Sequence, residues 1–204
     1  MQNELKKQWL ALWEILGAQG DPHTVFDDLV KRYSEPPRAY HTLRHVQNCL
    51  DEFQPAMDLA HDLEAVEIAL WYHDATSDEE RSATLAMEML RDASLPRSFG
   101  EQVATLVRAT KHGTLPIDPD ARLVADIDLS ILGQPEDIFD EYERQIRQEY
   151  EHVPLRTFAR KRREILLRFL KRPRIYLTRY FYDRYEFQAR RNLTRSVEKL
   201  SRST

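Results

Sequence analysis

The chain has 204 residues, which is enough for one domain with a substantial buried core. Its composition, 42% hydrophobic and 31% charged, is that of a soluble globular protein, and no stretch approaches the roughly 20 apolar residues of a membrane-spanning helix. The N-terminus mixes charged with apolar residues, unlike a signal peptide, and the single cysteine, Cys49, excludes an internal disulfide. We therefore expect a cytoplasmic protein with no membrane partner.

Apolar residues recur at helical spacing along almost the whole chain, which has only 5 glycines. Glycine and proline signals break this pattern at Gly17, Asp21-Pro22, Pro36-Pro37, Gly113, Asp118-Pro119, Gly133 and Pro173. The predicted helices occupy about 5–16, 22–33, 40–53, 61–73, 83–90, 103–110, 119–132, 138–150, 154–170 and 176–200. No segment alternates with the period of a strand. The sequence predicts an all-α protein of nine or ten helices.

Charge is divided unevenly along the chain. From Leu155 onward there are 16 Lys and Arg against 4 Asp and Glu, whereas the first 154 residues hold 14 against 30. Such a basic segment can bind nucleic acid, an anionic substrate or a protein partner. Because this one is also rich in aromatic residues, we expect it chiefly to pack against acidic parts of its own chain, with the remaining arginines solvated. Nucleic acid is not the favoured partner, but it stays an alternative.

His73 and Asp74 stand at the end of an apolar predicted helix, in the segment ALWYHDATSDEE. Both side chains can turn toward one point there, because the chain is leaving helical geometry. An imidazole nitrogen and a carboxylate oxygen together suit a divalent ion such as Mn, Fe, Co, Ni or Zn. His-Asp pairs also occur by chance, so the alternative is a histidine that is bonded to a helix-terminal carbonyl.

Two further segments supply polar groups that can face inward. His41 and His45 lie one helical turn apart, so at least one of them can reach the interior. The helical neighbours of Asp128 are apolar, whereas those of Asp126 are mixed. We expect Asp128 to point into the core, where an unpaired carboxylate is costly and a metal, an arginine or a histidine would compensate it. Asp126 is expected to face outward or to support the site.

In this order, His45, His73-Asp74 and Asp128 resemble the H…HD…D pattern of the HD superfamily of metal-dependent phosphohydrolases. The similarity extends over about residues 40–193 to a bacterial family of predicted HD phosphohydrolases. It rests on the segments YHTLRHVQNCL, ALWYHDA, EERSA, ATKH, ADIDLSILG, YERQIRQEY and ARRNL. The resemblance implies a divalent metal (Mn, Fe, Co, Ni, Zn or Mg) bound by His45, His73, Asp74 and Asp128. It also implies hydrolysis of a phosphate ester or anhydride of a small metabolite, for example a nucleotide.

The resemblance also implies the domain organisation. We expect a compact, multi-helix, HD-domain-like bundle over residues 1–204, with the metal-site core at about 38–135. The C-terminal helices, at about 136–204, would form an extension packed on that core. The oligomeric state is left open, and a homo-oligomer is allowed.

A hydrolase of this kind needs an acidic group near its water and cations near its phosphate. Asp78 and Glu79 are the candidates for the acidic group; the alternative is a helix N-terminus whose dipole favours acidic residues. The loop before EERSA is shorter than in the relatives, which leaves open which acid acts. The candidate substrate-binding residues are Arg44, Arg81, Lys111 and His112. Lys111 and His112 could instead compensate a helix dipole, and His112 could bind a second metal.

Two other functions compete with the phosphohydrolase. An HD-type di-iron oxygenase would need extra histidines between Asp74 and Asp128, where His112 alone is available. A non-catalytic module could bind a nucleotide or nucleic acid through the basic C-terminal third. Of the remaining polar residues, Cys49 is expected to be a small core residue, and Arg190 and Asn192 to brace the last helix.

Overall fold

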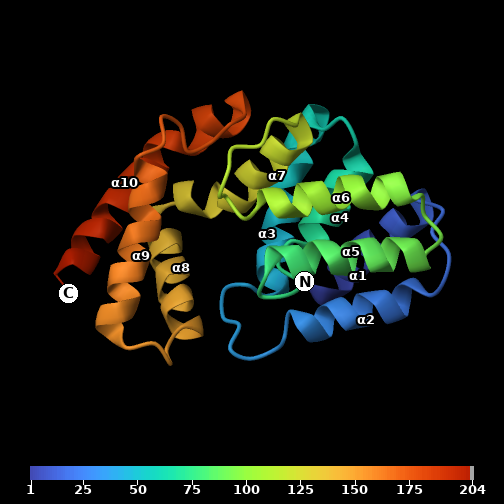
Figure 1. Cartoon of the computed structure of the whole chain (residues 1–204), viewed down its shortest axis with the longest axis horizontal. Coiled ribbons are helices and arrows are strands. Elements are labelled where there is room, and N and C mark those ends of the chain that lie inside the picture. Colours follow the sequence, from blue (N-terminus) through green and yellow to red (C-terminus); the bar gives the residue numbers. More distant parts are fainter. Residues whose placement is uncertain (203–204) are drawn as a thin grey trace. The chain divides into compact units, whose positions relative to one another are not determined.

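The computed structural model describes residues 1–202, which form helices and no strands (Figure 1). Residues 1–202 contain ten α-helices and two short 3-10 helices. In chain order these are α1 (Gln2–Ile15), α2 (Pro22–Arg32), α3 (Leu43–Phe53), η1 (Gln54–Leu59), α4 (Leu63–Tyr72), α5 (Glu79–Asp92), α6 (Arg97–Ala109), α7 (Pro119–Asp128), η2 (Leu129–Gly133), α8 (Glu136–Glu149), α9 (Leu155–Leu170) and α10 (Arg179–Ser201). The predicted all-α class is confirmed. Within the described residues, no helix has the length and hydropathy of a membrane span.

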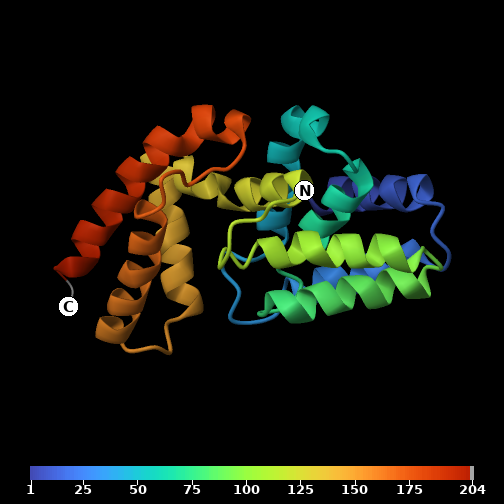
Figure 2. The same ribbon diagram turned by 45° about the horizontal axis from the view of Figure 1, so that its top comes forward.

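The chain divides into two compact units, Met1–Asp128 and Leu129–Thr204. The first unit contains α1 to α7 with η1, and the second contains η2 with α8 to α10 (Figure 2). The division falls where α7 passes into η2. The sequence-based expectation of one domain, with a metal-site core at about residues 38–135, stays a prediction.

Polar caps set the first residues of several helices in the first unit. The Asp21 carboxylate accepts hydrogen bonds from two backbone N–H groups of α2, at 3.0 and 3.3 Å, as the Asp21-Pro22 signal predicts. Asp62 caps α4 by accepting from the N–H of Ala65 at 2.9 Å. Thr42 caps α3, which therefore begins at Leu43 and not at the predicted residue 40.

Aromatic side chains hold α1 and α2 against α4. The rings of Trp9 and Trp71 meet edge to face with centroids 5.4 Å apart, and Phe26 packs on Trp71 at 6.2 Å. The Tyr33 hydroxyl donates to the carbonyl of Trp71 at 2.8 Å. All four side chains are buried, and each contributes roughly 1.5–3 kcal/mol by leaving water. This packing fixes the C-terminal end of α4, which the His-Asp pair follows directly.

Helix α7 packs against α3, α4 and α6 of the same unit. Its buried Asp120 accepts hydrogen bonds from the backbone N–H groups of His61, at 2.8 Å, and Asp62, at 3.0 Å. These two bonds join the start of α7 to the start of α4. The position of α7 is thereby fixed relative to the helix that carries the His-Asp pair.

In the second unit, basic residues of α9 and α10 pair with acidic residues of α8. The buried Arg162 guanidinium donates to the Glu143 carboxylate at 3.1 Å, and Arg195 and Lys199 both approach Asp140, at 2.7 and 3.3 Å. For these cations, the predicted pairing with acidic parts of the chain is confirmed.

Helix α10 also holds η2 in place. The Asn192 amide donates to the carbonyls of Leu132, at 2.9 Å, and Gln134, at 2.8 Å, which confirms its predicted bracing role. Gly133 lies against Tyr185 so closely that an added Cβ would stand 2.5 Å from the Tyr185 Cβ. A glycine at this position therefore permits the close approach of η2 and α10.

Candidate metal centre

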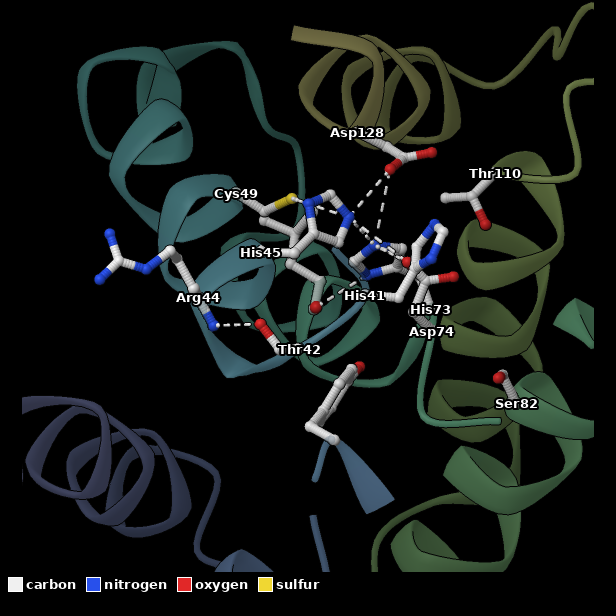
Figure 3. Close-up of polar contacts among 12 residues, drawn as sticks. His41, Thr42, Arg44, His45, Cys49, His73, Asp74, Ser82, Thr110 and Asp128 are labelled. Atoms are coloured by element: carbon white, nitrogen blue, oxygen red, sulfur yellow. Dashed lines mark hydrogen bonds and ion pairs between the residues drawn. The ribbon is translucent and has the colours of Figure 1, made fainter. Parts of the chain in front are cut away.

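Three elements of the first unit bring histidines and aspartates to one point (Figure 3). His45 lies in the first turn of α3, His73 is the C-cap residue of α4 and Asp74 follows it, and Asp128 is the last residue of α7. Because His73 and Asp74 stand where α4 ends, both side chains reach the same point, as the sequence predicts.

The donor atoms of these four residues are spaced as ligands of one ion would be. The Nε2 atoms of His45 and His73 are 2.9 Å apart. Both lie near the Asp74 Oδ2, at 3.3 and 3.2 Å, and near the Asp128 Oδ1, at 3.2 and 3.6 Å. Four ligands at about 2.1 Å from a tetrahedral ion would be separated by roughly 3.4 Å. The observed spacing therefore fits a single metal ion.

The tautomer of His73 also fits metal binding. Its Nδ1 lies 2.9 Å from the carbonyl oxygen of Leu70, which can only accept a hydrogen bond. Nδ1 must therefore carry a proton, and in the neutral ring Nε2 presents its lone pair to the cluster. The side chains of His45 and His73 are 2% and 1% exposed, whereas those of Asp74 and Asp128 are 22% and 17% exposed. The imidazoles close the buried side, and the carboxylates border the side that is open to solvent.

The negative carboxylates of the cluster raise the pKa values of its two buried histidines. Burial alone would lower the pKa of His73, but the carboxylates of Asp74 and Asp128 raise it well above its usual value. Burial acts in the same way at His45, whose pKa is nevertheless raised by Cys49 and Tyr40 and by the same two carboxylates. The carboxylates therefore favour positive charge at this point, and a divalent cation bound by neutral imidazoles can supply it.

The two carboxyl groups remain ionised in this setting. Burial disfavours their charge, but His73 and His41 hold the pKa of Asp74 well below its usual range. His112, His45 and His73 do the same for the pKa of Asp128. An ionised carboxylate is the form that binds a metal ion.

Cys49 is a further group close to the centre. Its Sγ atom and donor atoms of His45, His73 and Asp128 lie within 4.8 Å of one another, close enough to hold a metal ion. Sγ is 3.8 Å from the His45 Nε2, whereas the Asp74 Oδ2 lies closer to it, at 3.3 Å. Cys49 is buried, consistent with a core residue.

The residues predicted to bind substrate or activate water lie in different surroundings. Asp78 is exposed and caps α5 by accepting from the N–H of Arg81 at 2.9 Å, and Glu79 is half-buried in the first turn of that helix. Arg44 is exposed and its side chain points away from the cluster (Figure 3). The side chains of Arg81 and Lys111 are exposed as well.

His112 is the predicted substrate-binding residue that reaches the centre. Its Nε2 lies 2.8 Å from the Asp128 Oδ2, and its backbone has a positive φ of 52°. The sequence does not predict that the Tyr40 ring packs on the His45 ring, at 4.7 Å. Of the two alternatives for Asp126, the outward-facing one is wrong, because this residue is 0% exposed, and support of the site stays a prediction.

Comparisons of the whole chain with models of protein families, with curated proteins and with solved structures found no match.

Proposed function

We propose that this chain is a metal-dependent phosphohydrolase of the HD kind, with His45, His73, Asp74 and Asp128 as the metal ligands. The observation that carries the proposal is the convergence of two imidazole nitrogens and two carboxylate oxygens at 2.9–3.6 Å. The order of these residues in the sequence, and its resemblance to HD phosphohydrolases, support phosphate chemistry. The proposed substrate is a small phosphorylated metabolite.

The donor set favours some metals over others. Two nitrogen and two oxygen ligands suit borderline ions such as Mn, Fe, Co, Ni and Zn, whereas Mg prefers oxygen ligands throughout. A divalent ion held in this site would lower the pKa of a water molecule and polarise a phosphoryl oxygen.

The surrounding residues orient the ligands. In a neutral His112 beside an ionised Asp128, Nε2 carries the proton and donates it to Oδ2 at 2.8 Å. The other carboxylate oxygen, Oδ1, then faces His45 and His73. Asp128 is thereby held with one oxygen toward the centre. The partly exposed Asp74 and Asp128 border the side from which a substrate would enter.

Phosphate release from a panel of phosphorylated metabolites, with Mn, Co, Ni, Zn or Mg added in turn, tests the proposal. Wild type should release phosphate, and Asp74→Ala should lose both turnover and bound metal while staying folded. Asp28→Ala, an exposed change on α2, is the matched control and should behave as wild type. A folded, metal-loaded wild type that releases no phosphate from any substrate would refute the proposal. Iron retention with oxygen consumption would point instead to the oxygenase alternative.

The role of Asp78 can be separated from its capping role. Serine also caps helices but carries no carboxylate, so Asp78→Ser should keep the stability of α5. If Asp78 activates water, this variant loses turnover with its metal still bound. If Asp78 only caps α5, turnover is kept, and Glu79→Gln becomes the variant to test.

A further inference from the structure

The segment that connects α9 to α10 (Figure 1) is rich in basic residues. Residues 168–174, Arg-Phe-Leu-Lys-Arg-Pro-Arg, hold four cations and no acidic residue, and we refer to them as the basic turn. Arg168, Lys171 and Arg174 are exposed. The four cations are therefore concentrated in one short segment of the second unit.

Three of these cations have no acidic partner among residues 1–202. Most basic residues of α10 form ion pairs, for example Arg195 with Asp140 and Arg179 with Asp183. Arg168, Lys171 and Arg174, in contrast, make neither a hydrogen bond nor an ion pair through their side chains with any residue in 1–202. Their charge is therefore not compensated by the described part of the chain.

The basic turn is tied to α10 along its backbone. The Arg190 guanidinium donates to the carbonyls of Leu170, Arg172 and Pro173, at 3.1, 2.8 and 3.2 Å. The buried Glu186 accepts from the backbone N–H groups just after the turn, at 2.9 and 3.2 Å, and pairs with Arg190. The basic turn is thus preorganised, which reduces the entropy lost when a ligand binds.

The same contacts weaken a purely structural explanation of the charges. Cations near the end of a helix often compensate its terminal carbonyls. At the end of α9, Arg190 already donates to the carbonyls of Leu170 and Arg172. No hydrogen bond joins those carbonyls to the side chains of Arg168, Lys171 and Arg174. The charges of these three residues therefore remain available to an anionic ligand.

Two arginines of the turn lie over aromatic rings. The Arg172 guanidinium stands 4.6 Å from the centroid of the Phe169 ring, and that of Arg174 stands 4.7 Å from the Tyr182 ring. For the exposed Arg174, such stacking fixes the plane of the guanidinium and leaves its N–H edge able to bind phosphate. No residue of the turn belongs to the exposed large apolar side chains of the described chain, and insertion into a membrane would need such side chains.

We propose that the basic turn binds the phosphate backbone of single-stranded nucleic acid. Several cations within seven residues suit successive phosphates. A flexible single strand can bring its phosphates to such a short segment more readily than a duplex can. The proposal concerns the second unit alone and does not depend on the metal centre.

Fluorescence anisotropy with labelled oligo(dT) and oligo(U) of about 15 nucleotides tests this binding in the full-length protein. Three phosphate contacts, by Arg168, Lys171 and Arg174, predict that log affinity falls with log salt at a slope of about −2, which is roughly a 20-fold loss for a fourfold rise in salt. The triple variant Arg168→Gln, Lys171→Gln, Arg174→Gln should reduce the slope to near zero. Equal affinity for the two oligomers would mean that the protein recognises the phosphates alone. A preference for one oligomer would mean that its sugar or base also contributes to binding.

The control removes the same charge elsewhere. Lys31→Gln, Arg91→Gln and Arg97→Gln change three exposed cations of the first unit and should leave the slope near −2. Absence of binding at low salt, or an unchanged slope in the basic-turn variant, would overturn the proposal. Tighter binding to a duplex of equal length, or binding to anionic vesicles only, would overturn the assignment to a single strand. Asp74→Ala should bind as wild type, so failure of the proposed hydrolase leaves this test intact.

Discussion

Glu67 makes the stability of the first unit depend on pH. It is half-buried in the middle of α4, the helix that ends at the His-Asp pair. Burial, opposed by the Trp71 indole and reinforced by the charge of Glu64, raises the pKa of Glu67 from 4.5 to about 7. In the unfolded chain this carboxyl group has its ordinary pKa. Between pH 4.5 and 7, the folded protein therefore binds more protons than the unfolded chain.

The sign and size of the effect follow from that difference. Stability from this group is fully present below pH 4.5, falls as the pH rises, and is lost above the folded-state pKa of about 7. A shift of about 2.5 pKa units at about 1.36 kcal/mol per unit gives a loss of about 3 kcal/mol, which is an upper value because the side chain keeps some contact with water. Glu67→Gln stays neutral at every pH and should avoid this loss.

Urea unfolding at several pH values between 4 and 9 measures the effect. The free energy of unfolding of Glu67→Gln minus that of wild type should rise by about 3 kcal/mol between pH 4.5 and 8. Taking this difference removes the contribution of the histidines and aspartates of the metal centre, which titrate in both proteins. A difference that stays constant with pH would refute the reasoning.

Three further changes have expected outcomes. His112→Ala should weaken metal binding about 10- to 100-fold in equilibrium dialysis, because Asp128 loses its orienting hydrogen bond; unchanged affinity would contradict this role. Gly133→Ala should lower the free energy of unfolding by about 1–3 kcal/mol through the clash with Tyr185, and a Tm equal to wild type would argue against it. Asp120→Ala should cost about 1–3 kcal/mol, because two backbone N–H groups lose their acceptor. Asp120→Asn keeps an acceptor oxygen and should lose less, so equal losses would count against this explanation.

Patterns local in the sequence predict most of the fold. Helical periodicity identifies the helices, and the cap signals at Asp21 and Asp118 mark helix starts that the structure contains. The inward direction of Asp128 follows from its apolar neighbours one turn away. The meeting of His45, His73 and Asp128 could be expected only from their resemblance to a known order of residues, because periodicity gives no distance between helices.

The remaining features depend on tertiary contacts. Periodicity fails for Asp126 because Leu123 to Ile127 of α7 are all buried, so a mixed set of helical neighbours does not mark a solvent face at this residue. The contact of His112 with Asp128 depends on a left-handed backbone conformation at the end of α6, and histidine gives little signal for it. The uncompensated charge of the basic turn is likewise invisible in the sequence, which shows many arginines but not which of them are paired.

The four proposed ligands all belong to the first unit, and Asp128 is its last residue. Each is positioned by helices of that unit, through the packing of α7 on α3, α4 and α6 and through the aromatic contacts that fix the end of α4. The spacing of the donor atoms should therefore be insensitive to any movement between the two units. In evolutionary terms, the second unit is free to acquire new charges or a new binding surface while the geometry of the metal centre stays constant.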